Sequence, residues 1–201
     1  MLKLERVYRA LVQMSLNQKA TLPQQDLAKD CRVSLGMVNK VVSRLEAMQA
    51  VEATRQGVRV LSPGRILNLW ATERRISGDV WRSFRLDGVK ESDLPGKTLL
   101  TAFSGWSVFT KRRPAEYYSL YFYVLDKEAF EEWLSFREGS LRRTNPNVFA
   151  LYAEDEHLSE TSTRGIVPVP QIFVDLYSVD GPEASPFLRD IAQTYPVLAL
   201  Y

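Results

Sequence analysis

The chain has 201 residues, of which 45% are hydrophobic and 25% are charged, and its formal net charge at pH 7 is +2. These proportions are typical of a globular protein and exclude a disordered chain. No apolar run reaches the roughly 18 residues of a membrane-spanning helix. The first residues read as an amphipathic helix carrying Glu5 rather than as a signal peptide. We therefore expect a cytoplasmic protein of one large or two modest domains, without a membrane as partner.

Cysteine and histidine are scarce, because the chain has one of each, Cys31 and His157. One cysteine cannot form an internal disulfide, and the pair is too few for structural zinc. Cys31 is placed where a helix would bury a small side chain. We expect an inert core thiol, no metal and no cofactor.

Charge is distributed unevenly along the chain. Residues 1–65 contain 11 Lys and Arg against 5 Asp and Glu, whereas residues 66–201 contain 15 against 19. A basic front part joined to an acidic rear part predicts that the front part binds a polyanion. We expect the rear part to bind a different partner.

The front part begins with two amphipathic helices. In the first helix the apolar residues recur at helical spacing, which predicts that Lys3, Arg6 and Arg9 lie off the buried face. The apolar set is Leu4, Val7, Tyr8, Leu11, Val12 and Leu16. A second helix is expected over residues 22–31, with Pro23 at its first position. Its packing residues are Leu22, Leu27, Ala28 and Cys31.

A third helix is expected from Leu35 to about Met48, after a tight turn at residues 32–34 and with Ser34 as its N-cap. Its buried stripe is Val38, Val41 or Val42, and Leu45. The opposite face mixes cations, hydrogen-bonding groups and an apolar contact: Gly36, Met37, Asn39, Lys40, Ser43 and Arg44. Such a mixture suits the base edges of a DNA major groove. Two helices joined by a short turn are typical of a helix-turn-helix.

A hairpin follows, because Val51, Ala53, Val58 and Val60 alternate around residues 55–57. Gly57 is expected to supply the positive φ that a hairpin tip often needs. Arg55 and Arg59 lie on or beside the tip and can reach the DNA backbone or a minor groove. We therefore expect a winged helix-turn-helix domain over residues 1–61 that binds double-stranded DNA. Its expected DNA-binding residues are Ser34, Gly36, Met37, Asn39, Lys40, Ser43, Arg44, Arg55 and Arg59.

The segment SLGMVNKVVSRLEAMQAVE resembles the Ser-x-x-x-Val-x-x-Val-x-x-Leu-Glu recognition helix of MarR-type winged-helix regulators. The resemblance covers about 60 residues and implies DNA binding. Winged helices also serve as protein-docking modules, and this alternative remains open. Lys40 is as well placed for a phosphate as for a base.

The rest of the chain predicts a connecting helix within residues 62–78 and a small α/β domain over residues 79–201. Expected strands are 80–88, 116–126, 147–155 and a short one at 164–170. The strand at 116–126 is apolar on both faces and should be central. Expected helices are 98–110, 126–136 with Asp126 as cap, 170–181 and 184–195. The whole chain is therefore expected to belong to the α+β class.

The sequence contains no complete constellation of catalytic residues, so we expect no enzyme. Gly139-Ser140 is followed by Arg142 and Arg143 rather than by the paired carboxylates of a nucleotidyltransferase. The acidic run Glu154 to Glu156, followed by His157, is either a divalent-ion site or a solvated loop.

Two other groups in the rear part leave alternatives open. The basic runs at 111–113 and 142–143 are plain surface or contacts to nucleic acid or an acidic partner. Tyr117, Tyr118, Tyr121 and Tyr123 are an aromatic core strand or the lining of a ligand pocket.

The order of the pieces along nearly the whole chain is similar to the AbiEi family of antitoxin regulators from type IV toxin-antitoxin systems. The segments that carry this resemblance are RILNLWATERR, LLTAFSGWSVF, NVFALYAED, RGIVPVPQIFVDLYSVDG and EASPFLRDIA. In the family's Val-x-x-x-Gln-x-x-x-Asp-Leu pattern, the matching residues are Val167, Gln171, Asp175 and Leu176. The resemblance implies a repressor of its own operon that opposes a nucleotidyltransferase toxin and has no enzymatic activity. The rear domain departs from the family in lacking a strongly basic face.

Three hypotheses about function follow from these observations. The first is an AbiEi-like transcriptional regulator, with a homodimer on inverted repeats as its usual assembly. The second is a metal-dependent nuclease or nucleotidyltransferase that is delivered to DNA and uses Asp175 or the run Glu154 to Glu156. The third is a ligand-sensing winged-helix regulator without a toxin partner.

Overall fold

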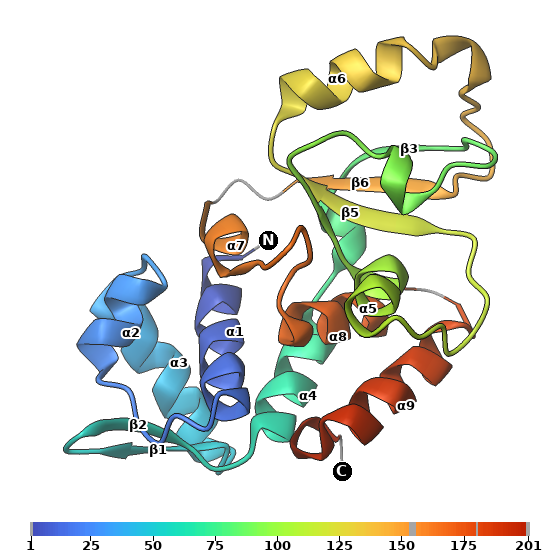
Figure 1. The fold of residues 1–201 in the computed structure, drawn as a ribbon. Helices are drawn as coiled ribbons and strands as arrows, with labels where there is room; N and C mark the ends of the chain where they lie inside the picture. The colour runs from blue at the N-terminus through green and yellow to red at the C-terminus, as the bar shows by residue number, and fades with distance from the viewer. Residues whose placement is uncertain (1, 153–155, 180, 200–201) are drawn as a thin grey trace. The chain divides into compact units, whose positions relative to one another are not determined.

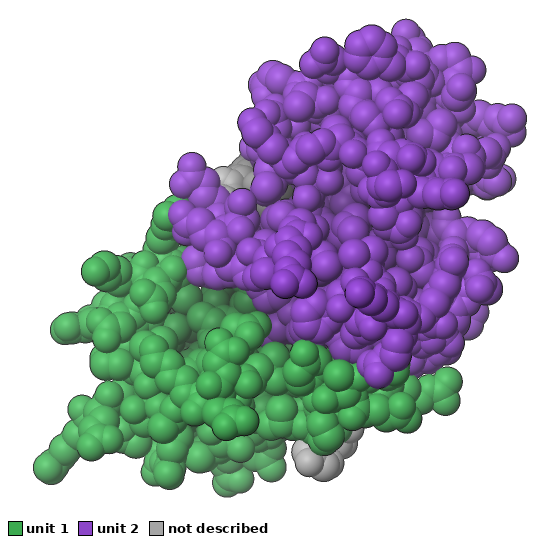
Figure 2. All heavy atoms as spheres, in the orientation of Figure 1, with its two compact units in different colours: residues 1–74, 189–201 green, residues 75–188 purple. Residues whose placement is uncertain are grey.

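The structure is a computed structural model and describes residues 2–152, 156–179 and 181–199. Helices and two small sheets are mixed along the chain (Figure 1), so the expected α+β class is confirmed. Contacts divide the chain into two compact units (Figure 2). Unit 1 comprises residues 1–74 and 189–201, and unit 2 comprises residues 75–188. The helix that was expected to connect two domains therefore groups with unit 1.

Unit 1 consists of helices around a two-stranded antiparallel hairpin. In chain order its elements are α1 (Lys3–Leu16), α2 (Gln24–Asp30), α3 (Leu35–Ala47), β1 (Val51–Thr54), β2 (Gly57–Val60) and α4 (Pro63–Glu73). The last helix, α9 (Ala184–Thr194), begins in unit 2 and ends in unit 1. Ser62 caps α4 by accepting a hydrogen bond from the Arg65 amide at 3.4 Å.

Helix α1 is the centre of the unit 1 core, since it contacts α2, α3 and α4. Val7, Leu11 and Val12 are fully buried, as predicted. The expected placement of Arg6 and Arg9 off the buried face is wrong, because their exposures are 8% and 1%. Neighbouring helices cover α1 on more than its apolar stripe, so long basic side chains there have no route to solvent. The Arg6 guanidinium instead donates to the carbonyl oxygens of Cys31 and Arg32, at 3.3 and 3.4 Å.

The second helix is shorter than the expected span of residues 22–31, because Pro23 is its N-cap residue and Leu22 pairs with Val58 of β2 instead. The predicted packing residues Leu22, Leu27, Ala28 and Cys31 are all buried. Burial raises the pKa of the Cys31 thiol to about 12. A thiol with that pKa carries almost no thiolate near neutral pH, which agrees with the expected inert core role.

Unit 2 is built on a four-stranded sheet in the order β3-β6-β5-β4. Its strands are β3 (Val80–Phe84), β4 (Thr98–Leu100), β5 (Leu120–Val124) and β6 (Val148–Tyr152). Strands β5 and β6 are parallel, and the two outer pairs are antiparallel. The helices are α5 (Ala102–Thr110), α6 (Lys127–Ser135), α7 (Glu156–Thr161), α8 (Val169–Tyr177) and the start of α9. Short 3-10 turns lie at Ile76–Asp79, Glu91–Asp93, Glu138–Ser140 and, in unit 1, Pro196–Leu198.

Strand β5 lies inside the sheet, which confirms its expected central position. Its side chains alternate between two covered faces. Phe122 packs on Phe130 of α6, with ring centroids 5.9 Å apart. On the other face Tyr121 packs on Phe103 of α5, and the Tyr123 hydroxyl reaches α8. Helices on both faces explain why the strand is apolar throughout.

Helix α6 confirms its predicted cap, because Asp126 Oδ1 accepts from the Ala129 amide at 3.0 Å. The same carboxylate lies 2.8 Å from the Lys97 ammonium. The backbone hydrogen bond and this ion pair lower the pKa of Asp126.

Two expected elements in the rear part are wrong. The helix expected over 98–110 begins at Ala102, because residues 98–100 pair with β5 as strand β4. The short strand expected at 164–170 is reduced to isolated bridges at Ile166, and Pro168 is already the N-cap residue of α8. In the first case strand pairing across the fold overrides a local pattern. Helix α7, which begins at Glu156, was not expected from the sequence.

Among the described residues, none of the helices combines the length and the apolar character needed to cross a membrane.

Candidate nucleic-acid interface

Helices α2 and α3 are joined by a turn whose geometry starts α3 at a defined residue. Arg32 has φ 52°, in the left-handed region, and the chain becomes extended again at Ser34. Ser34 Oγ then accepts a hydrogen bond from the Met37 amide at 3.2 Å, as its predicted capping role requires. The Ser34 hydroxyl is therefore used inside the protein, and its role at the candidate interface is to fix the first turn of α3.

Helix α3 separates an inner and an outer face as its sequence predicts. Val38, Val41, Val42 and Leu45 are buried with exposures of 5% or less. The outer residues Gly36, Asn39, Lys40, Ser43 and Arg44 are exposed, and Met37 is half-buried. One continuous helix face thus presents an amide, hydroxyl, ammonium and guanidinium group to solvent.

The hairpin that follows α3 has a two-residue turn at Arg55 and Gln56, with Thr54 paired to Gly57. Thr54 Oγ1 accepts from the Gln56 amide at 3.2 Å and donates to the Gly57 carbonyl at 2.9 Å. These bonds close the tip and leave the Arg55 side chain exposed.

Gly57 has a second reason to be glycine that the sequence pattern does not reveal. Its φ is 135°, and a Cβ there would lie 2.4 Å from the Leu22 carbonyl oxygen. The Leu22 backbone pairs with Val58 of β2 through two hydrogen bonds of 3.1 and 2.8 Å. Close approach of the segment before α2, together with the backbone conformation, therefore requires glycine.

Two of the predicted DNA-binding cations already have acidic partners. Arg44 Nη1 lies 2.5 Å from Glu73 Oε1 and also donates to the Tyr8 hydroxyl at 3.4 Å. Arg59 forms an ion pair with Glu52 across the hairpin. Burial, and then the Glu73 charge, raises the pKa of Tyr8 to about 12, so this hydroxyl stays protonated beside Arg44.

The other two predicted cations differ in this respect. Within the described part of the chain, Lys40 and Arg55 have no carboxylate oxygen within 4.0 Å. An exposed cation without an internal partner loses no ion pair when it contacts a phosphate. Lys40 and Arg55 are therefore the two predicted cations whose charge is not already neutralised by a carboxylate of the described residues.

Residues that sequence reasoning did not single out hold the outer face of α3 in place. Arg65 of α4 donates to the Met48 carbonyl at 2.9 Å, which places a cation at the C-terminal end of α3. Glu46 Oε1 accepts from the Ala53 amide at 2.7 Å and ties α3 to β1. Glu46 lies in the last turn of α3, and Arg65 lies in the next helix beyond the hairpin, so their positions along the sequence do not identify these partners.

Asp175, the carboxylate used by the enzymatic alternative, is fully buried in unit 2. Its Oδ2 accepts from Thr101 Oγ1 at 2.7 Å and from the Tyr123 hydroxyl at 2.9 Å, and its Oδ1 accepts from Gln171 Nε2 at 3.0 Å. A carboxylate that is surrounded by internal donors and shielded from solvent holds α5, β5 and α8 together. This geometry does not support its use as a metal ligand at an open site.

The acidic run of the same alternative is only partly described. Glu154 and Asp155 lie outside the described residues, Glu156 is exposed, and His157 is 3% exposed. Among the described residues no group of three or more His, Cys, Asp and Glu side chains is arranged to hold a metal ion.

The structure gives different surroundings to the members of the two groups whose roles the sequence left open, the basic runs at 111–113 and 142–143 and the tyrosines at 117–123. Arg113 stacks its guanidinium over the Tyr117 ring at 4.4 Å and pairs with Glu116, while Arg142 pairs through its backbone with Arg85. Tyr121 and Tyr123 belong to the core, whereas Tyr117 and Tyr118 line a pocket.

Comparison with known proteins assigns no family to these features. The chain has no significant match to a protein-family model, to a curated protein or to a solved structure.

Proposed function

We propose that residues 3–60 form a winged helix-turn-helix that binds duplex DNA, and that the protein is a transcriptional regulator. The observation that carries this proposal is the exposed face of α3, where Asn39, Lys40 and Ser43 lie opposite a fully buried apolar stripe. The order of α2, a short turn, α3 and a hairpin supports the same assignment.

Electrostatics supports DNA as the partner of unit 1. Unit 1 has a net charge of +6 and unit 2 a net charge of −4. Glu5, Arg6, Arg9 and Arg74 are buried, which leaves +4 on the rest of unit 1. The positive field therefore comes from exposed groups, which is the footprint expected of a nucleic-acid-binding unit.

The proposed contacts differ in kind. Asn39 and Ser43 offer hydrogen bonds to base edges in the major groove, and Met37 offers an apolar contact to a thymine methyl group. Lys40 and Arg55 contact phosphates or, for Arg55, an adjacent minor groove. Arg44 and Arg59 contribute less, because contact with a phosphate competes with Glu73 and Glu52.

The test is a titration of labelled duplexes, selected from a random pool, with the full chain at several salt concentrations. Lys40→Ala is expected to weaken binding to all duplexes alike and to lower the slope of log K against log salt by about one. Asn39→Ala is expected to change which duplexes are preferred, since an amide reads base edges.

Arg189→Ala is the matched control for charge, because Arg189 is an exposed cation of unit 1 on α9, outside α3 and the hairpin. It should leave both affinity and sequence preference unchanged. Absence of duplex binding at low salt, or equal loss in Lys40→Ala and Arg189→Ala, would contradict the proposal.

The resemblance to AbiEi antitoxins extends the proposal to unit 2, which would oppose a nucleotidyltransferase toxin. The matching residues Val167, Gln171, Asp175 and Leu176 are all buried. These residues belong to the core, so a toxin would contact other residues of unit 2. Cells arrested by a nucleotidyltransferase encoded beside this chain should grow again when this chain is co-expressed. Failure of this rescue would contradict the antitoxin role and would leave the proposed DNA binding unaffected.

A further inference from the structure

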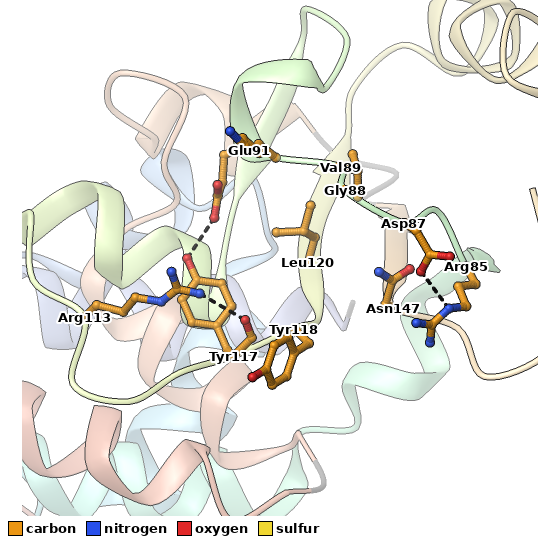
Figure 3. Close-up of a pocket in the computed structure, with 11 residues that line it drawn as sticks. Arg85, Asp87, Gly88, Val89, Glu91, Arg113, Tyr117, Tyr118, Leu120 and Asn147 are labelled. Atoms are coloured by element: carbon orange, nitrogen blue, oxygen red, sulfur yellow. Dashed lines mark hydrogen bonds and ion pairs between the residues drawn. The ribbon is translucent and has the colours of Figure 1, made fainter. Parts of the chain in front are cut away.

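Unit 2 contains a pocket of about 660 Å³ between the loop after β3 and the segment before β5 (Figure 3). Its lining residues are Arg85, Asp87, Gly88, Val89, Lys90, Glu91, Arg113, Tyr117, Tyr118, Leu120 and Asn147. This volume falls in the range of about 300–1,000 Å³ that is typical of small-molecule sites. The pocket plays no part in the proposed DNA contacts.

One wall of the pocket is a rigid aromatic assembly. The Arg113 guanidinium lies over the Tyr117 ring, 4.4 Å from its centroid, and the Phe103 ring stacks with Tyr117 at a centroid distance of 5.4 Å. The Tyr117 hydroxyl donates to Glu91 Oε1 at 2.7 Å. The ring and the hydroxyl are therefore already engaged by groups of the protein, so Tyr117 forms a fixed wall rather than a stacking surface for a ligand.

Tyr118, unlike Tyr117, presents a free ring to solvent. Its side chain is 80% exposed, and within the described part of the chain its ring packs on no other aromatic ring. Figure 3 shows Tyr118 near Tyr117 at the pocket, with Leu120 between this group and Asn147. Leu120 is 6% exposed and adds an apolar surface. A free aromatic ring and a buried leucine suit a flat ring that stacks and excludes water.

The charges that line the pocket leave one cation without an internal partner. Asp87 is balanced by Arg85 at 2.8 Å and approached by Arg142 at 3.9 Å. Glu91 accepts from Tyr117, and Arg113 pairs with Glu116 at 3.3 Å. Among the described residues, Lys90 has no carboxylate oxygen within 4.0 Å. An exposed ammonium at a pocket whose carboxylates are already engaged favours an anionic group.

Asn147 shapes the far side. Its Oδ1 accepts from the Leu86 amide at 2.9 Å and its Nδ2 donates to the Leu86 carbonyl at 3.2 Å. The two bonds hold the start of the loop that carries Asp87 and Lys90 against β6. The pocket wall is thereby preformed.

We infer that this pocket binds a small anion that carries a flat ring, with the ring against Tyr118 and Leu120 and the anionic group at Lys90. A nucleoside monophosphate and an aromatic carboxylate are the two sources of this chemistry. The inference concerns unit 2 alone and does not depend on DNA binding by unit 1.

Calorimetric titration of the full chain tests it with adenosine monophosphate and benzoate as probes, and with adenosine and inorganic phosphate as comparisons. At least one ring-bearing anion should bind, and more tightly than adenosine or phosphate. Tyr118→Ala should weaken that binding about tenfold, as loss of one ring stack does. Tyr118→Phe should retain it, and Lys90→Gln should weaken it about fivefold and reduce its salt dependence.

Two variants serve as matched controls. Phe136→Ala removes an aromatic ring that is 79% exposed, and Lys111→Gln removes an exposed ammonium, both in unit 2 and away from the lining residues. Neither should change the affinity. Absence of binding by both anions at millimolar concentration overturns the inference, and so does phosphate or adenosine binding as tightly as the anions. Equal effects of Tyr118→Ala and Phe136→Ala would also overturn it.

Discussion

The two units bury polar side chains in different ways. Unit 1 buries ions: Glu5, Arg6, Arg9 and Arg74 are all buried, and Arg74 Nη1 lies 3.6 Å from Glu5 Oε2. Unit 2 instead buries the Asp175 carboxylate among hydroxyl and amide donors. The lesson is that charges counted along a sequence are not all available at a surface. Three of the cations that make unit 1 basic belong to its core.

The units also differ in the kind of surface on which function is proposed. Unit 1 offers a convex helix face whose side chains stand in solvent, and unit 2 offers a pocket. A helix face suits a groove of DNA, whereas a pocket suits a small ligand. Substitutions at buried contacts measure how much the stability of each unit depends on them.

The largest effect is expected from Asp175→Ala in unit 2. It removes the acceptor that Thr101, Tyr123 and Gln171 share, while Gln171 Nε2 still donates to the Tyr123 hydroxyl at 3.2 Å. Loss of a buried hydrogen-bond partner costs about 1–3 kcal/mol. We expect unfolding free energy to fall by about 4 kcal/mol in urea denaturation. Asp175→Asn is the matched control, since an amide of the same shape keeps one acceptor oxygen and should lose less than half as much. Equal stability of Asp175→Ala and the parent chain would contradict a structural role for this network.

A smaller effect is expected from Gly57→Ala in unit 1. The new Cβ would meet the Leu22 carbonyl oxygen at 2.4 Å, and alanine is also disfavoured at φ 135°. We expect a loss of about 3 kcal/mol in thermal or urea unfolding. Gly88→Ala in unit 2 is the comparison, because Gly88 has φ 75° but nothing within 4 Å of a Cβ. It should lose only about 1 kcal/mol, and a similar loss for both variants would mean that the contact between Leu22 and the hairpin contributes little.

The smallest stability effect is expected from Ser34→Ala, which removes the side-chain acceptor for the Met37 amide. Loss of an N-cap typically costs about 1 kcal/mol. Ser34→Asp keeps a capping oxygen and should retain stability, but it adds a negative charge at the start of α3. Under the proposed function this variant should bind duplex DNA more weakly than Ser34→Ala despite being more stable. The reverse order in filter binding would argue against DNA contact at this end of the helix.

The local features of this protein could be predicted from its sequence, because they depend on neighbours along the chain. Helical spacing identified α1, α2 and the two faces of α3, and Ser34 and Asp126 act as the caps that their types and positions predict. The alternation of apolar residues identified the hairpin, and the fully apolar strand at 120–124 was correctly expected to be central.

Tertiary structure decided what depends on partners that are distant in sequence. It buried Arg6 and Arg9, paired Arg44 with Glu73, and turned residues 98–100 from the expected helix into a strand through pairing with β5. It also brought Lys90, Tyr118 and Asn147 to one pocket from three separate segments. Spacing along a chain encodes periodicity, whereas burial, ion pairing and pocket formation arise only when segments far apart in the sequence pack against one another.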